Sequence, residues 1–345
     1  MRAMGAPRHR TPLLVLTAVV LVSGVLAALD FRNATYTGYL TDGDRTIIQV
    51  ADGSPAAAAG MQEGDRLVSI GGIAVSDMRG LSRQARAAAG EVRTIEIDRA
   101  GQTVPLQLEY ASMPAREALA YRLATLLGLA FIGFGLWAYF AAPGPATAVL
   151  AYFGVSFGFA FVGVPYFQAP AMRALVDATI TAAILIGFAL LLHFLLLYPR
   201  RRALLDRPSG LRFVYAPAIA VALFFVALTV LQPDATSGLN VFVRTLIGLF
   251  IAGYFVTSLV VLYRGYAAAD ARVRKENGLA LMLAGAVLGL GPLIVSSVVG
   301  LLSPTTVLPG SRFYFLALAL IPVTFAIAAV RGARASSVPV AAGVS

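Results

Sequence analysis

Two residues in the apolar part of the sequence are of the types that perform nucleophilic chemistry. Ser156 lies in Gly154-Val155-Ser156-Phe157-Gly158, which has the spacing of the elbow that presents an activated serine. His193 is the only histidine after residue 9 and therefore the only imidazole base for that serine. The elbow needs a strand followed by a helix, whereas both residues lie in apolar helical runs, at depths that differ by about 10 Å. We interpret Gly154 and Gly158 as small residues at which helices pack, and His193 as an interfacial packing residue.

The sequence contains few residues that are suited to other kinds of catalysis. The chain has no cysteine, which excludes disulfides and thiolate metal ligands, and it lacks the His-Glu-x-x-His pattern of zinc proteases. Asp177 and Arg244 lie in the first turns of apolar runs, where their side chains reach water easily. We therefore predict a protein that is not an enzyme and has no catalytic residues, no metal and no cofactor. A membrane enzyme or transporter with an uncharged polar site is the alternative.

The composition is that of a membrane protein. Of 345 residues, 59% are hydrophobic and only 13% are charged, and the mean hydropathy is +0.80. An average soluble domain is about 45–50% apolar and about 25% charged, so a soluble enzyme and a disordered chain are both excluded. Eight apolar runs are long enough to span a bilayer, and they cover 13–29, 119–140, 147–166, 174–197, 213–231, 241–263, 279–302 and 313–330. We predict a polytopic α-helical membrane protein with about eight transmembrane helices, one before and seven after a small inserted α+β domain.

The distribution of basic residues predicts the orientation in the membrane. The segments 1–12, 198–212, 264–278 and 331–345 together carry 14 basic residues and three acidic ones. Short loops rich in Arg and Lys stay in the cytoplasm, so we place both termini there and residues 31–112 in the periplasm of a bacterial inner membrane. The formal net charge of +10 then records orientation beside a lipid bilayer, and we predict no nucleic-acid partner.

These observations divide the chain into four parts. Residues 1–30 form a cytoplasmic N-terminus and the first transmembrane helix, or a signal peptide cleaved near Val25-Leu26-Ala27. Residues 31–112 form the periplasmic domain, 113–331 the seven-helix transmembrane domain and 332–345 a cytoplasmic tail.

The inserted segment has the alternation and the turn residues of a small soluble fold. Asp77 is suited to cap a helix over 78–89, which Gly90 would end. The predicted strands are 46–50, 66–70, 92–99 and 104–110.

Within this segment, Gly53 to Val75 reads GSPAAAAGMQEGDRLVSIGGIAV. This run resembles the "GSPA..AGL..GD.I..I.G..V" block of bacterial PDZ domains, and the resemblance extends over about 36–112. It implies a PDZ fold in which the structural positions are Gly53, Pro55, Gly60, Gly64 and Asp65.

The resemblance also implies a binding site. PDZ domains bind extended peptides, usually C-terminal ones, as an added strand whose carboxylate is held by a Gly-containing loop. Here that loop is Thr37-Gly38-Tyr39-Leu40, and the helix over 78–89 forms the other wall, so the resemblance assigns peptide binding to Gly38, Tyr39, Leu40, Met78 and Leu81. The sequence departs from the pattern because Thr41 replaces a frequent second glycine and Asp42-Gly43-Asp44 follows. Two hypotheses stay open: a groove for a periplasmic peptide or protein C-terminus, and a docking module without a free-peptide ligand.

A second resemblance concerns the helices. The run His193-Phe194-Leu195-Leu196-Leu197-Tyr198-Pro199-Arg200 resembles a helix end in multi-helix sensory regions that precede bacterial histidine kinase or serine phosphatase domains. Residues 262–266, 272–278 and 289–292 are similar to later segments of those regions. Only 14 residues follow Arg331, too few for an output domain, so the resemblance implies a sensor-like input module with a separate cytoplasmic signalling partner. An accessory subunit of a membrane protease or secretion complex is the alternative.

Overall fold

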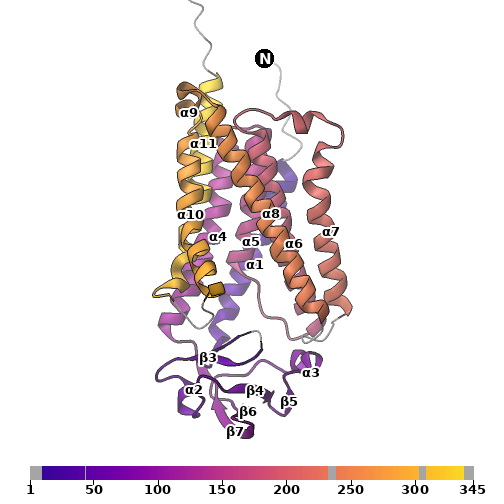
Figure 1. The fold of residues 1–345 in the computed structure, drawn as a ribbon, viewed down its shortest axis with the longest axis vertical. Helices are drawn as coiled ribbons and strands as arrows, with labels where there is room; N and C mark the ends of the chain where they lie inside the picture. Colours follow the sequence, from indigo (N-terminus) through magenta and orange to yellow (C-terminus); the bar gives the residue numbers. More distant parts are fainter. Residues whose placement is uncertain (1–9, 43, 232–237, 303–307, 338–345) are drawn as a thin grey trace, which may run out of the picture.

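The computed structural model describes residues 10–42, 44–231, 238–302 and 308–337. Eight helices in these residues are long and apolar enough to cross a membrane. They form one bundle, and a small β-rich domain caps one end of it (Figure 1). The predicted helical architecture is confirmed: one long helix precedes the small domain and seven follow it.

The long helices agree with the apolar runs of the sequence to within a few residues at most ends. They are α1 (Arg10–Asp30), α4 (Ala115–Ala141), α5 (Pro145–Val162), α6 (Pro170–Leu197), α7 (Gly210–Leu231), α8 (Gly238–Ala268), α10 (Leu279–Leu302) and α11 (Leu320–Ser337). The short α9 (Ala271–Glu276) separates α8 from α10, and the 3-10 helix η3 (Ser311–Ala319) leads into α11. Pro145 and Pro170 start their helices at a position where the missing N–H costs nothing.

Small residues bring the helices of the bundle close together. A Cβ atom on Gly158 of α5 would lie 2.9 Å from the carbonyl oxygen of Gly128 in α4, and one on Gly154 would collide with the carbonyl oxygen of Phe131. The two glycines of the serine-elbow spacing therefore serve helix packing. Gly285 in α10 has the same role, because a Cβ there would collide with Thr324 of α11.

The two ends of the bundle differ in what they carry. The β-rich domain lies at one end, whereas the α6–α7 connection, α9 and the C-terminal end of α11 lie at the other (Figure 1). The described parts of the basic segments therefore all gather at the end away from the domain, as the charge count requires.

The β-rich domain contains a four-stranded antiparallel sheet in the order β5-β4-β6-β7. Its strands are β4 (Arg66–Ile70), β5 (Ile73–Ala74), β6 (Val92–Arg99) and β7 (Gln102–Glu109). Two strand pairs accompany the sheet: β1 (Thr35–Tyr36) with β8 (Ala111–Ser112), and β2 (Tyr39–Thr41) with β3 (Ile47–Val50). The helices α2 (Pro55–Ala58) and α3 (Met78–Arg83) complete the domain, which has its own core around Ile47, Ile95, Ile97 and Leu108. The β1–β8 pair joins the chain leaving α1 to the chain entering α4.

Candidate functional site: the groove of the β-rich domain

The loop before β2 is anchored to the turn that leads into α2. The carbonyl oxygens of Thr37 and Gly38 accept hydrogen bonds from the backbone amides of Ala56 (2.9 Å) and Ala51 (2.8 Å). Gly38 has a φ of 83°, and a Cβ atom there would collide with the Ser54 side chain, so the position requires glycine. Its N–H makes no hydrogen bond to any described residue, and Gly38 is partly exposed.

Strand β2 follows this loop and leaves one edge open. On its paired edge, Tyr39 lies opposite Val50 and Leu40 opposite Gln49, and the register shifts between Leu40 and Thr41. On the other edge, no strand pairs with β2 in the described part of the chain. An unpaired edge of this kind is a template for an added strand. The edge is only three residues long.

Tyr39 and Leu40 differ in their surroundings. Tyr39 is half-buried against the domain core, and burial, followed by the neighbouring Tyr110, raises the pKa of its phenol to about 12. Leu40 is 55% exposed although it is a large apolar residue. The exposed Leu40 side chain is available to a ligand, whereas the Tyr39 side chain packs against the domain core.

Asp42 closes the turn between β2 and β3. Its Oδ1 atom accepts hydrogen bonds from the amides of Asp44 (2.9 Å) and Thr46 (2.8 Å). Such a turn is typical of aspartate, whose short side chain bonds the backbone nearby. The departure from the PDZ pattern at Asp42 therefore has a structural role, because this carboxylate builds the hairpin.

The predicted helix over 78–89 is wrong beyond Arg83. Asp77 caps α3 as expected, because its Oδ1 accepts from the amide of Gly80 at 2.9 Å. Met78 is the first residue of α3, and Leu81 is half-buried against the domain core. After Arg83 the backbone becomes extended at Gln84. Helix α3 is therefore about half as long as the helix that the PDZ resemblance assigned to the groove.

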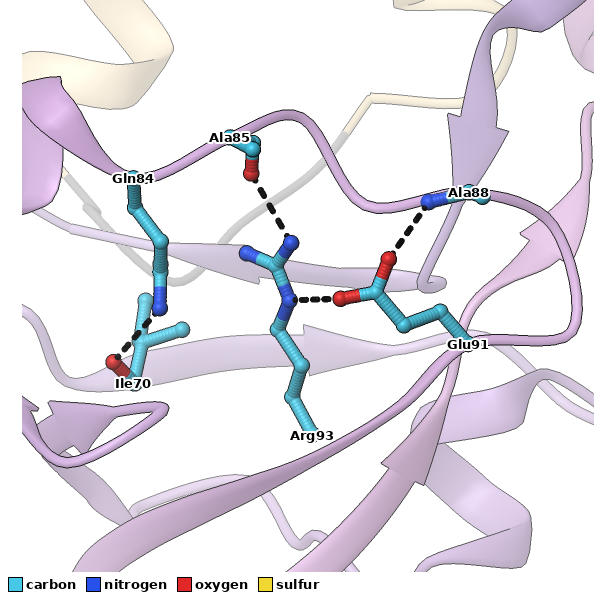
Figure 2. Close-up of polar contacts among 6 residues, drawn as sticks. All are labelled: Ile70, Gln84, Ala85, Ala88, Glu91 and Arg93. Carbon is cyan, nitrogen blue, oxygen red and sulfur yellow. Dashed lines mark hydrogen bonds and ion pairs between the residues drawn. The ribbon is translucent and has the colours of Figure 1, made fainter.

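The segment that follows α3 is held in its extended form by its own Gln84 and by Glu91 and Arg93, around the start of β6 (Figure 2). The Arg93 guanidinium donates to the carbonyl oxygen of Ala85 at 2.8 Å, and Gln84 donates to the carbonyl of Ile70. Glu91 pairs with Arg93 at 2.6 Å and accepts from the amide of Ala88 at 2.9 Å, and these two contacts, Arg93 first, lower the pKa of Glu91. These contacts override the helical propensity of the alanine-rich run.

The structural positions assigned from the PDZ resemblance lie in α2 and in the turns before and after it. Gly53, Gly60 and Gly64 all have positive φ angles, and Pro55 is the first residue of α2. Asp65 is only 2% exposed and binds Arg99 through two bonds of 2.8 and 2.7 Å.

The Asp65–Arg99 pair joins the end of β6 to the turn between α2 and β4. Asp65 also accepts from the amide of Gln62 at 2.7 Å, and Arg99 donates to the carbonyl of Gly60 at 2.8 Å. The hydrogen bond from Arg99 is the main reason that the pKa of Asp65 lies below its usual range.

Ser156 and His193 do not form a catalytic pair. Ser156 lies against Gly187 of α6, where an added Cβ would be 3.5 Å from the serine Cβ. His193 follows Gly187 by six residues, or about 9 Å along the helix. Its Nδ1 instead lies 2.8 Å from the hydroxyl of Tyr215 in α7. Both residues pack helices together.

Comparison with known proteins supports the first of the two resemblances. Residues 46–99 match the family model described as PDZ domain. The matched segment runs from the start of β3 to the end of β6, so it includes α2, the Asp65–Arg99 pair and α3, but not the loop at Gly38. The match does not extend into the helices, where the likeness to sensory regions stays a hypothesis. No curated protein matches the chain.

Proposed function

We propose that this protein is a non-enzymatic inner-membrane PDZ protein that binds the terminus of a peptide or protein in the periplasm. The open edge of β2 beside the free amide of Gly38, within a PDZ-like domain, carries the proposal. The ligand backbone would pair with β2, its carboxylate would accept from Gly38, and α3 would form the opposite wall. Binding of C-terminal peptides to the full chain in lipid nanodiscs tests this directly; wild-type protein should bind a subset, and a complete failure to bind would refute the proposal.

The contacts of the domain with the bundle favour a relay or scaffold toward a cytoplasmic partner. Arg86, three residues after α3, donates to Asp30 at the end of α1 at 3.0 Å. Its guanidinium also lies 5.0 Å from the ring centre of Tyr166, in the α5–α6 connection. A movement of α3 on ligand binding would therefore act on the ends of two membrane segments. The partner would meet the basic segments at the other end of the bundle.

Substitution Arg86→Gln should separate peptide binding from this relay. We expect the peptide affinity to stay within about twofold, because Arg86 lies outside the proposed peptide site. Stability should fall by at most about 1 kcal/mol, because the side chains of the pair are 24% and 29% exposed. In wild-type protein, bound peptide should slow hydrogen exchange in residues 163–169, and the variant should lose this response. Equal responses in both proteins would contradict a relay through Arg86.

The absence of cysteine allows the orientation to be tested with single substitutions. Gln102→Cys places a thiol on the exposed surface of β7, and Arg207→Cys places one in the exposed α6–α7 connection. A membrane-impermeant maleimide should label only the first in spheroplasts and both after the membrane is opened. The reverse pattern in intact spheroplasts would place the domain in the cytoplasm.

A further inference from the structure

A cavity of about 270 Å³ lies where the β-rich domain meets the bundle. Its wall combines the end of α1, the segment after α3, the α5–α6 connection and the first turns of α6. The charged residues that line it are Asp30, Arg86, Arg173 and Asp177. Neither the peptide groove nor the relay uses Arg173 or Asp177.

One half of this charged lining is fully satisfied. The Oδ2 atom of Asp30 accepts from Arg86 at 3.0 Å and from the amide of Tyr166 at 3.1 Å. The guanidinium groups of Arg86 and Arg173 lie 5.0 and 5.2 Å from the ring centre of Tyr166. These contacts fix the inner wall and pair the charges of Asp30 and Arg86 with each other.

The other half carries two opposite charges, Arg173 and Asp177, which attract each other but are not in ion-pair contact. Arg173 donates through Nη1 to the Tyr166 hydroxyl at 2.9 Å, but its buried Nη2 has no acceptor in the described part of the protein. Asp177 lies one helical turn further along α6, is exposed, and makes no ion pair among the described residues. Buried donors without an acceptor are rare, and a bound water or ion is one of their ordinary explanations.

An aromatic wall stands beside these charges. The rings of Phe31, after α1, and Tyr121, in α4, stack with their centres 4.0 Å apart, and both residues line the cavity. The cavity lies where α1 ends and α6 begins. In the membrane arrangement proposed above, this is the level of the lipid head groups. The cavity offers a donor for an anionic oxygen, an acceptor for an ammonium group, and an apolar surface.

We propose that this cavity binds a zwitterion of the phosphoethanolamine type, with its phosphate on Arg173 and its ammonium on Asp177. A phosphatidylethanolamine head group and free phosphoethanolamine offer the same chemistry. The volume corresponds to roughly nine water molecules, which suits a group of that size. Because Arg86 of the domain completes the wall, occupancy would hold the domain against the bundle. This proposal is independent of the peptide groove.

The test compares lipids retained by the full chain. Protein is placed in nanodiscs with equal phosphatidylethanolamine and phosphatidylcholine, and the lipids that remain bound are counted by native mass spectrometry. Wild-type protein should prefer the ethanolamine lipid at least tenfold. Arg173→Gln should lose this lipid. Asp177→Asn should bind both lipids equally, because it removes the carboxylate that accepts from the ammonium N–H groups, which choline lacks. Arg116→Gln, an exposed site on the first turn of α4, is the matched control and should behave as wild type.

A second arm identifies the source of the ligand. Free phosphoethanolamine is added to protein in pure phosphatidylcholine nanodiscs, and thermal unfolding is followed. A shift that Asp177→Asn abolishes supports a free zwitterion, whereas retention of the lipid without this shift supports the head group. Equal retention of both lipids by wild-type protein, together with no shift, would overturn the proposal. Asp177 is exposed, so its variant should fold and keep the test decisive if Arg173→Gln does not.

Discussion

Substitution Gly38→Ala is expected to weaken peptide binding to the full chain at least tenfold. Alanine in the left-handed conformation costs about 1–2 kcal/mol, and the added Cβ atom would also collide with Ser54. The loop must then move, and its free N–H would no longer point at the ligand carboxylate. Since about 1.4 kcal/mol corresponds to a factor of ten, these costs together predict the stated loss. Fluorescence anisotropy with a labelled C-terminal peptide measures it in nanodiscs.

The matched control for this variant is Gly101→Ala. Gly101, in the β6–β7 hairpin, has the same φ of 83° as Gly38, but an added Cβ would meet no atom within 4 Å. Both variants pay the same backbone cost, and only the first displaces the loop beside β2. Equal peptide affinities for the two variants would show that the Gly38 loop does not bind the ligand.

Substitution Asp65→Asn should destabilise the β-rich domain by about 2–3 kcal/mol. The asparagine leaves Arg99 without its ionic partner; the Asp65 side chain is only 2% exposed and the Arg99 side chain 34%. Hydrogen bonds to charged groups contribute about 1.5–3 kcal/mol each. Hydrogen exchange of β4 and β6 in the full chain measures the change. Asp52→Asn, at an exposed turn position, should leave exchange unchanged.

The same ion pair predicts how the domain responds to acid. Arg99 lowers the pKa of Asp65 in the folded state, so the unfolded state binds the proton more readily. The stabilisation is therefore complete above the ordinary aspartate pKa of about 3.9 and is lost as the pH falls through the lower, folded-state value. In wild-type protein, protection of β4 should fall below about pH 4, whereas Asp65→Asn should lack this step. A step of equal size in the variant would assign it to other carboxylates.

The helices and most of the domain could be predicted because their signals are local. A bilayer-spanning run must be long and apolar, so the sequence marks all eight helices. Gly60 and Gly64 stand where turns need positive φ angles, and Asp77 has the side chain that caps a helix. Each of these requirements is met by residues within a few positions of one another.

The segment after α3 shows where local signals fail. Alanine-rich residues 85–89 favour a helix, but Arg93 in β6 and Glu91 just before it bind the backbone groups of Ala85 and Ala88. The contact of Arg86 with Asp30 joins residues 56 positions apart, and no spacing in the sequence indicates it. The junction cavity depends on such long-range contacts. The sequence did single out Asp177, but it could not show that Arg173 lines the same wall.

The central claim is that the Gly38 loop and the open edge of β2 hold the terminus of a peptide. The most direct measurement screens a library of C-terminal peptides against the full chain in nanodiscs and then compares each hit as the free acid and as the C-terminal amide. We predict that the free acids bind, that the amides bind at least tenfold more weakly, and that Gly38→Ala removes the difference. A library without hits, or hits that bind equally well as acids and amides to both proteins, would contradict the account.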